Sequence, residues 1–216
     1  MKVLSRTVGA FRENTYLVID DETGDAVVID PGDEGDVIVA MIESSGATLR
    51  AVWLTHAHLD HIGAISAVRR RFGDVAVHLH PLDRPVYDAQ AFFAESYGVA
   101  FEQPEAPDLE LAHGDVMHVG NLSFDVIHVP GHSPGHVAFH GHGIVLGGDV
   151  LFAGSIGRTD LPMANPAHMQ ESLNKMAALP PETIVYPGHG DATSIGEELS
   201  SNPFLNGMAN VKRNAN

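Results

Sequence analysis

A short run of ligand-type side chains dominates this sequence: Thr55-His56-Ala57-His58-Leu59-Asp60-His61. It directly follows the apolar run 51–54, which predicts a buried strand, and it precedes residues 62–72, whose apolar side chains recur at helical spacing. The run therefore occupies a turn from a strand into a helix, where the side chains of α/β proteins converge on a ligand. Imidazole and carboxylate are the ligands that borderline divalent metals prefer. The sequence thus predicts a metal site at the end of a buried strand.

The spacing within this run indicates more than one metal ion. His56 and His58 lie two positions apart in an extended segment, so both can face one ion. Asp60 and His61 lie on the following turn and can serve a second ion. Later in the chain, three further candidate ligands each follow a predicted strand and lie beside glycine, which lets the backbone approach an ion closely. These candidates are His132, Asp149 and His189.

The rest of the chain alternates short β-rich runs with helical runs. Strands are expected at residues 3–8, 15–19, 26–29, 51–54, 75–80, 116–119, 122–129, 136–140, 144–146 and 183–186. Helices are expected at residues 37–44, 62–72, 87–97 and 166–178. Because no linker or low-complexity segment separates the two halves, we expect one α/β domain over residues 1–216.

The charge balance of the chain disfavours some classes of partner. Its 12 lysines and arginines against 28 aspartates and glutamates give a formal charge of −16, which disfavours nucleic acids and anionic membranes and leaves a small-molecule substrate. The sequence holds no cysteine, so thiolate ligands and disulfides are excluded. It shows neither a signal-peptide pattern nor an apolar run of the ~20 residues that span a membrane, so we expect a cytoplasmic protein. The sequence does not predict the oligomeric state.

Together with Asp30-Pro31-Gly32 after a predicted strand, these residues resemble the metallo-β-lactamase superfamily over nearly the whole chain. The resemblance implies a four-layer αββα sandwich of two mixed β-sheets flanked by helices, with the metals at one edge. Asp30 would orient one of the ligand histidines. The ligand roles that the resemblance implies are His56, His58 and His132 for the first ion, Asp60, His61 and His189 for the second, and Asp149 as the bridge.

The implied cofactor is a pair of divalent metal ions. Zinc is expected, with iron or manganese as alternatives, because imidazole and carboxylate groups suit all three. Two cations lower the pKa of a shared water to ~7, which gives a metal-bound hydroxide at neutral pH. Asp60 and Asp149 are then the catalytic carboxylates, since Asp60 accepts a hydrogen bond from the hydroxide and Asp149 holds both ions.

Within the superfamily, the chain is similar to short bacterial glyoxalase II-like (hydroxyacylglutathione hydrolase-like) proteins at residues 147–152, 157–162 and 186–190. Those enzymes hydrolyse the thioester of S-D-lactoylglutathione, so the resemblance implies thioester hydrolysis. Full-length glyoxalase II also carries a C-terminal helical domain that contacts glutathione. Only about 27 residues follow His189 here, so we expect that domain to be absent and assign no glutathione-binding residue.

Other functions fit the same residues. Persulfide dioxygenases share the fold and the histidine–aspartate pattern but use one iron ion. Lactonases and other small-ester hydrolases use the same metal chemistry. A metal-binding module without catalytic activity is a third class, and open coordination positions would argue against it because structural sites are saturated by protein ligands.

The remaining candidate residues have two interpretations each. Arg158 follows the implied bridging aspartate and either contacts the substrate or forms a structural ion pair. His136 lies near the cluster but begins a predicted strand, so packing is favoured over metal ligation. The other histidines outside the cluster are expected in strands, loops and a helix start rather than in the site.

Overall fold

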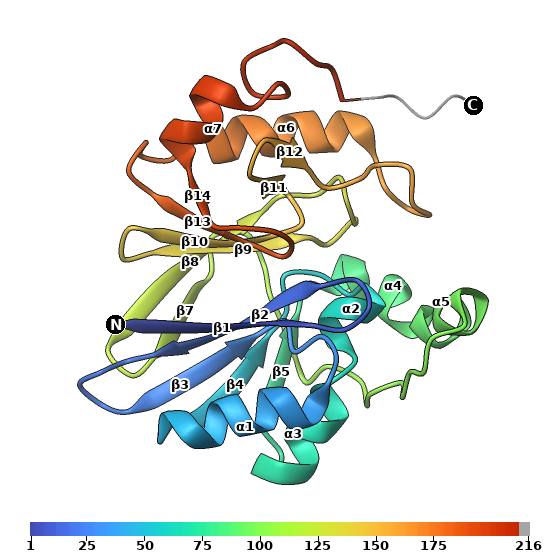
Figure 1. Ribbon diagram of the computed structural model, residues 1–216, viewed down its shortest axis with the longest axis vertical. Coiled ribbons are helices and arrows are strands. Elements are labelled where there is room, and N and C mark those ends of the chain that lie inside the picture. The colour runs from blue at the N-terminus through green and yellow to red at the C-terminus, as the bar shows by residue number, and fades with distance from the viewer. Residues whose placement is uncertain (212–216) are drawn as a thin grey trace.

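Two six-stranded β-sheets pack face to face in the computed structural model, which describes residues 1–211 (Figure 1). The N-terminal sheet has the order β1 (Lys2–Val8), β2 (Glu13–Ile19), β3 (Asp25–Ile29), β4 (Thr48–Trp53), β5 (Ala76–Leu79), β6 (Leu109–Glu110). The C-terminal sheet has the order β14 (Thr193–Ser194), β13 (Ile184–Pro187), β10 (Ile144–Gly148), β9 (Val137–Gly141), β8 (Leu122–His128), β7 (Val116–Val119). Both sheets are mixed, since β3 to β6 run parallel and so do β10 and β13.

Helices cover the outer face of each sheet (Figure 1). Helices α1 (Gly35–Ser45) and α3 (Ile65–Phe72) pack on the N-terminal sheet, and α6 (Pro166–Ala177) and α7 (Ile195–Ser201) pack on the C-terminal sheet. The layers are therefore helix, sheet, sheet and helix, which confirms the predicted αββα sandwich. Within residues 1–211, no helix combines the length and the apolar character needed to cross a membrane.

Strand β2 shows how one sheet separates two cores. All seven of its residues are buried, and successive side chains point to opposite faces. Tyr16 and Val18 face the C-terminal sheet, in the core that contains Trp53, whereas Leu17 and Ile19 face α1 and α3. A slip of one residue would exchange the two faces, so this alternation fixes the register of the strand. The ends of the neighbouring strands are thereby held at defined positions.

The prediction of one helix over residues 62–72 is wrong, because two shorter helices replace it: α2 (Leu59–Ile62) and α3. The backbone N–H of Ala64 donates to the carbonyl oxygen of Pro31 at 3.0 Å instead of to the preceding helical turn. The loop after β3 therefore interrupts the helix. This interruption leaves α2 as a single turn that carries Asp60 and His61.

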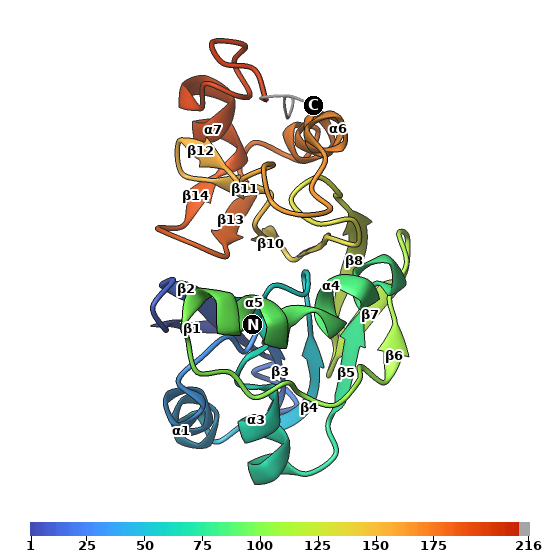
Figure 2. The same ribbon diagram turned by 90° about the vertical axis from the view of Figure 1, so that its right-hand side faces the viewer.

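The predicted helix at residues 87–97 is also divided, into α4 (Arg84–Asp88) and α5 (Gln90–Tyr97). Both project from one side of the molecule, at the right of Figure 1 and toward the viewer in Figure 2. Several short elements were not predicted. Most of them are strands of two residues, which carry no periodic signal. They are the 3-10 helix η1 (Pro81–Asp83), strands β6, β11 (Leu151–Phe152), β12 (Ser155–Ile156) and β14, and helix α7.

Candidate metal centre

The loops that follow β4, β8, β10 and β13 meet at one edge of the sandwich. Backbone hydrogen bonds join them: the N–H of Val137 donates to Thr55 at 2.8 Å, and the N–H of Gly188 donates to Gly148 at 2.9 Å. The first of these bonds connects the two sheets. The loops carry the residues 55–61, His132, Asp149 and His189 respectively.

Six of the predicted ligands form two groups of three. In the first triad (His56, His58, His132) and in the second triad (Asp60, His61, His189), the ligand atoms lie within 4.8 Å of one another. The shortest separation is 2.8 Å, between Nδ1 of His58 and Nε2 of His132. The structure thus brings together every residue that the sequence assigned to each ion, while the assignment of ligand to metal stays a prediction.

Asp149 lies between the two triads. Its Oδ1 atom is 3.5 Å from Nε2 of His61, and its Oδ2 atom is 3.4 Å from Nε2 of His132 and 3.5 Å from Nε2 of His189. One carboxylate therefore contacts ligands of both groups, as a bridging residue must.

The buried donor atoms of the site fit divalent cations. Nε2 of His56, Nε2 of His61 and Oδ1 of Asp149 have no hydrogen-bond partner among residues 1–211, although all three are buried. Such an unsatisfied atom costs about 1–3 kcal/mol, so native structures seldom retain one without a role. These three atoms belong to the triads or to the residue between them; the other buried side-chain atoms without a partner in that range are Glu13 Oε1, His136 Nδ1 and Thr183 Oγ1. Imidazole nitrogen and carboxylate oxygen are the donors that zinc and iron accept.

Burial sets the charge states of the cluster. It lowers the pKa of His58 to about 3 and that of His56 well below its usual value, so both rings are neutral, as metal ligation requires. At Asp149 burial raises the pKa, but the neighbouring His61 and the hydrogen bond from His189 outweigh it and hold that pKa below its ordinary range. The first triad therefore combines neutral imidazoles with the ionised carboxylate of Asp149. In the second triad, burial lowers the pKa of His61 and His189, but the neighbouring carboxylates outweigh it and raise both.

Asp30 has the position that the resemblance implies. Its Oδ2 atom lies 3.0 Å from Nδ1 of His61, which directs Nε2 of that ring toward Asp149. Thr55 donates its backbone N–H and its hydroxyl to the same carboxylate, at 2.7 and 2.6 Å. Asp30 has a φ of 49°, a left-handed conformation that non-glycine residues seldom adopt, and these bonds hold it there.

Sequence reasoning missed Asp83, which is fully buried between two ligand loops. Its Oδ2 atom accepts the backbone N–H of Ala57 at 2.9 Å and the hydroxyl of Ser133 at 2.8 Å. The available signal was its place after β5, because the carboxyl ends of the parallel neighbours β4 and β5 lie at the same sheet edge.

His136 packs beside the first triad in the structure, and the preference for packing over metal ligation stays a prediction. Its ring stacks on that of His56 with centroids 4.8 Å apart. Its Nε2 atom accepts the backbone N–H of Asp149 at 2.9 Å, so that nitrogen is engaged. His136 consequently helps to place Asp149 without belonging to either triad.

A cavity of about 500 Å³ opens beside the ligands and includes His58, Asp60 and Asp149 in its lining. Arg158 also lines it. The guanidinium of Arg158 forms two bonds to Asp160, Nε to Oδ1 at 2.7 Å and Nη2 to Oδ2 at 2.9 Å. The structural ion pair considered for Arg158 is therefore present, and contact with a substrate stays a prediction.

Comparison with known proteins places this geometry in a family. The sequence profile described as Metallo-beta-lactamase superfamily matches residues 8–189, a span that holds both triads and Asp149. The chain belongs to the metallo-β-lactamase superfamily. Within that superfamily it is 36% identical, over 203 residues, to hydroxyacylglutathione hydrolase GloC of Haemophilus influenzae, covering 92% of this chain and 95% of that protein.

Two solved structures of superfamily proteins are similar along nearly their whole length. TTHA1623 in a di-iron-bound form is 44% identical, with a TM-score of 0.87, covering 94% of this chain and 100% of that one. The BLEG-1 B3 metallo-β-lactamase is 36% identical, with a TM-score of 0.88, covering 94% and 99%. The chain is thus a superfamily metallo-hydrolase with histidine–aspartate metal sites.

Proposed function

We propose that this chain hydrolyses a thioester or a closely related small acyl compound with two divalent metal ions, of which zinc is the first choice. The observation that carries the proposal is the contact of Asp149 with both triads, in the lining of a cavity of about 500 Å³. The similarity to a hydroxyacylglutathione hydrolase supports it. The formal charge of −16 supports a small molecule rather than a nucleic acid as the substrate.

Bound cations supply Lewis acidity toward the substrate carbonyl and a nucleophile at neutral pH. The chain's own carboxylates then position the reaction. Asp60 lines the cavity, so its carboxylate can accept a proton or hydrogen bond from an attacking water. Its Oδ2 atom lies 3.3 Å from Nε2 of His189. Asp149 contacts both triads, so it would hold the ions that they bind at a fixed separation and help to align the substrate carbonyl with the nucleophile.

The cavity favours a substrate with a good leaving group. Among the described residues that line it, Tyr97 and Arg158 are the titratable side chains outside the ligand set, and both are more than half exposed. A thiol has an ordinary pKa of ~8.5, so it departs as thiolate without a dedicated acid. Amide hydrolysis would need a positioned proton donor. This difference favours thioesters over amides.

Metal analysis combined with a hydrolysis assay tests the proposal. Protein purified without added metal should contain close to two ions per chain and should hydrolyse S-D-lactoylglutathione. Asp149→Ala should lose both ions and reduce kcat by at least about 10³-fold, whereas His189→Ala should keep the first ion and retain more activity.

Three results would contradict the proposal. One is a fully metal-loaded protein without thioesterase or esterase activity. Another is oxygen uptake with glutathione persulfide by a protein that binds one iron, which would indicate a dioxygenase. The third is equal metal content and equal residual kcat in the Asp149→Ala and His189→Ala variants, which would remove the bridging role.

A further inference from the structure

Apart from the metal ligands, the walls of the cavity are mainly apolar. They come from five parts of the chain: the β1–β2 loop, the start of α2, helices α4 and α5, the β11–β12 hairpin and the loop before α6. The aromatic and aliphatic residues on these walls include Phe11, Val86, Phe93, Phe152, Ile156 and Leu161. Apolar surface of this kind stabilises an apolar group that it removes from water, by about 25 cal/mol per Å².

The cavity offers little to a charged substrate. Apart from the ligand histidines, Arg158 is the only cationic side chain among the described residues that line it. Its charge is already paired with Asp160, and the two side chains are 61% and 64% exposed. An anionic substituent of a substrate would therefore find no unpaired lysine or arginine among the described residues that line the cavity.

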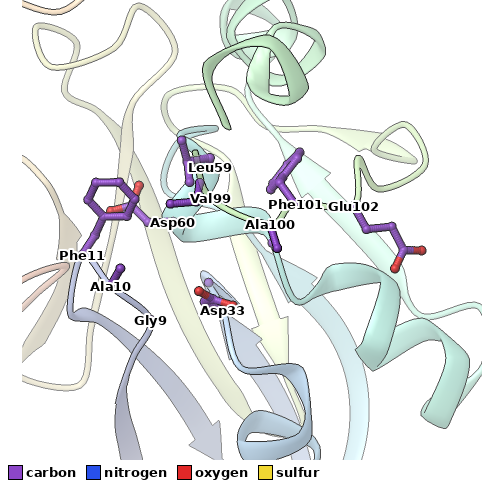
Figure 3. Close-up of a pocket in the computed structure, with 12 residues that line it drawn as sticks. Gly9, Ala10, Phe11, Asp33, Leu59, Asp60, Val99, Ala100, Phe101 and Glu102 are labelled. Atoms are coloured by element: carbon purple, nitrogen blue, oxygen red, sulfur yellow. The ribbon is translucent and has the colours of Figure 1, made fainter. Parts of the chain in front are cut away.

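A second hollow of about 330 Å³ adjoins the cavity, and Phe11, Leu59 and Asp60 line both. Figure 3 shows Phe11 and Asp60 on one side of it and Phe101 and Glu102 on the other. Its lining includes carboxylates and, among the described residues, no lysine or arginine. A glutathione moiety carries two carboxylates and one ammonium group. Among the described residues, neither hollow supplies an unpaired lysine or arginine for those carboxylates.

We propose that the substrate is a thioester with an uncharged apolar acyl group, aliphatic or aromatic, which the cavity walls bind, and that the charges of the thiol are not recognised. We assign the acyl group, rather than the thiol, to the apolar walls because biological acyl carriers are polar thiols. This inference rests on the proposed thioester hydrolysis and adds the substrate class. The walls then provide binding energy that holds the carbonyl at the metal centre.

Helix α5 offers a matched pair of residues for a test. Phe93 lines the cavity, while its neighbour Phe92 is 70% exposed and is not among the lining residues, although the two ring centroids lie 5.6 Å apart. Tyr97, on the same helix, contacts Phe11 of the β1–β2 loop with ring centroids 6.0 Å apart, and both rings line the cavity. The two segments thus form a continuous apolar wall, and Phe93 can be shortened without touching a metal ligand.

The test compares kcat/KM of the metal-loaded protein for five thioesters. Four are thioesters of the uncharged thiol N-acetylcysteamine, with lactoyl, butanoyl, hexanoyl and phenylacetyl groups. The fifth is S-D-lactoylglutathione. Each buried methylene should raise kcat/KM about fourfold, so hexanoyl should exceed butanoyl by about 10-fold or more. Phe93→Ala should reduce that preference below about threefold and leave the lactoyl thioester within about twofold. Phe92→Ala should change neither.

The outcomes separate the substrate class from the reaction. If S-D-lactoylglutathione is hydrolysed at least about 10-fold more efficiently than every N-acetylcysteamine thioester, the apolar acyl site is wrong while thioester hydrolysis stands. The same conclusion follows if Phe93→Ala and Phe92→Ala behave alike. If the metal-loaded protein hydrolyses none of the thioesters, the proposed function itself fails. Should Phe93→Ala not fold, Ile156→Ala, from the C-terminal half, serves the same comparison.

Discussion

The Oδ1 atom of Asp83 lies 2.5 Å from the backbone nitrogen of Gly135, in the loop that carries His132. An added Cβ at position 135 would lie 2.9 Å from the Cβ of Asp83, so this approach requires glycine. The other oxygen of Asp83 binds the N–H of Ala57, in the loop that carries the first two ligand histidines. One buried carboxylate therefore sets the spacing of the two loops that form the first triad.

Replacing Asp83 should weaken metal binding at the first triad. Asp83→Ala leaves two backbone N–H groups and one hydroxyl without their acceptor, each at a cost of about 1–3 kcal/mol. We expect a lower Tm and about 10–100-fold weaker binding of one of the two ions, measured by competition with a chelator. Asp88→Ala on α4 is the control, because Asp88 is exposed and paired with Arg84. A folded Asp83→Ala protein with unchanged affinity for both ions would disprove this role.

The ion pair of Arg158 predicts a small effect of its removal. Exposed pairs contribute about 0–1 kcal/mol, so Arg158→Ala should lower the Tm little and leave KM for uncharged thioesters within about twofold. Asp160→Asn frees the guanidinium and should lower KM for S-D-lactoylglutathione, which carries carboxylates. Steady-state kinetics of the two variants check this. A clear rise in KM for S-D-lactoylglutathione in Arg158→Ala would instead show direct contact between Arg158 and a substrate carboxylate.

The metal-free protein should lose stability as the pH rises above neutrality. Burial lowers the pKa of His189, but hydrogen bonds to Asp149 and Asp60 outweigh it and raise that pKa from 6.5 to about 10. The protonated ring therefore stabilises the fold fully below pH 6.5, and this contribution disappears as the pH increases toward 10. Metal binding must displace the proton, so it should release protons at pH 8.

Denaturant unfolding of chelator-treated protein between pH 6 and 10 measures this effect, and His189→Gln is the comparison variant. The decline with pH should be smaller in His189→Gln than in the original chain. Identical pH profiles for the two metal-free proteins would show that His189 does not carry the proton.

The ligand set was largely readable in the sequence because its members are local or follow strands directly. His56, His58, Asp60 and His61 lie within one turn, and the structure brings His132, Asp149 and His189 to the same edge. Apolar runs and strand periodicity located the long strands, since buried positions are continuous on β2 and β3 and alternate along the start of β8. The four-layer arrangement came from the family resemblance rather than from the pattern of individual residues.

The remaining features depend on contacts between distant parts of the chain. Asp83 binds partners 26 and 52 residues away, which a single sequence does not reveal. The break between α2 and α3 comes from the bond of Ala64 to Pro31, so helical periodicity alone could not predict it. Likewise, the pairing of Arg158 with Asp160 is visible only once the loop has a conformation.

The count and spacing of bound ions test the central claim most directly. An anomalous difference map from crystals grown at saturating zinc or iron should show two peaks ~3.5 Å apart, with Asp149 between them, the first triad on one ion and the second triad on the other. A single peak under the same conditions, with His61 and His189 free of metal, would contradict the two-metal site on which this account depends.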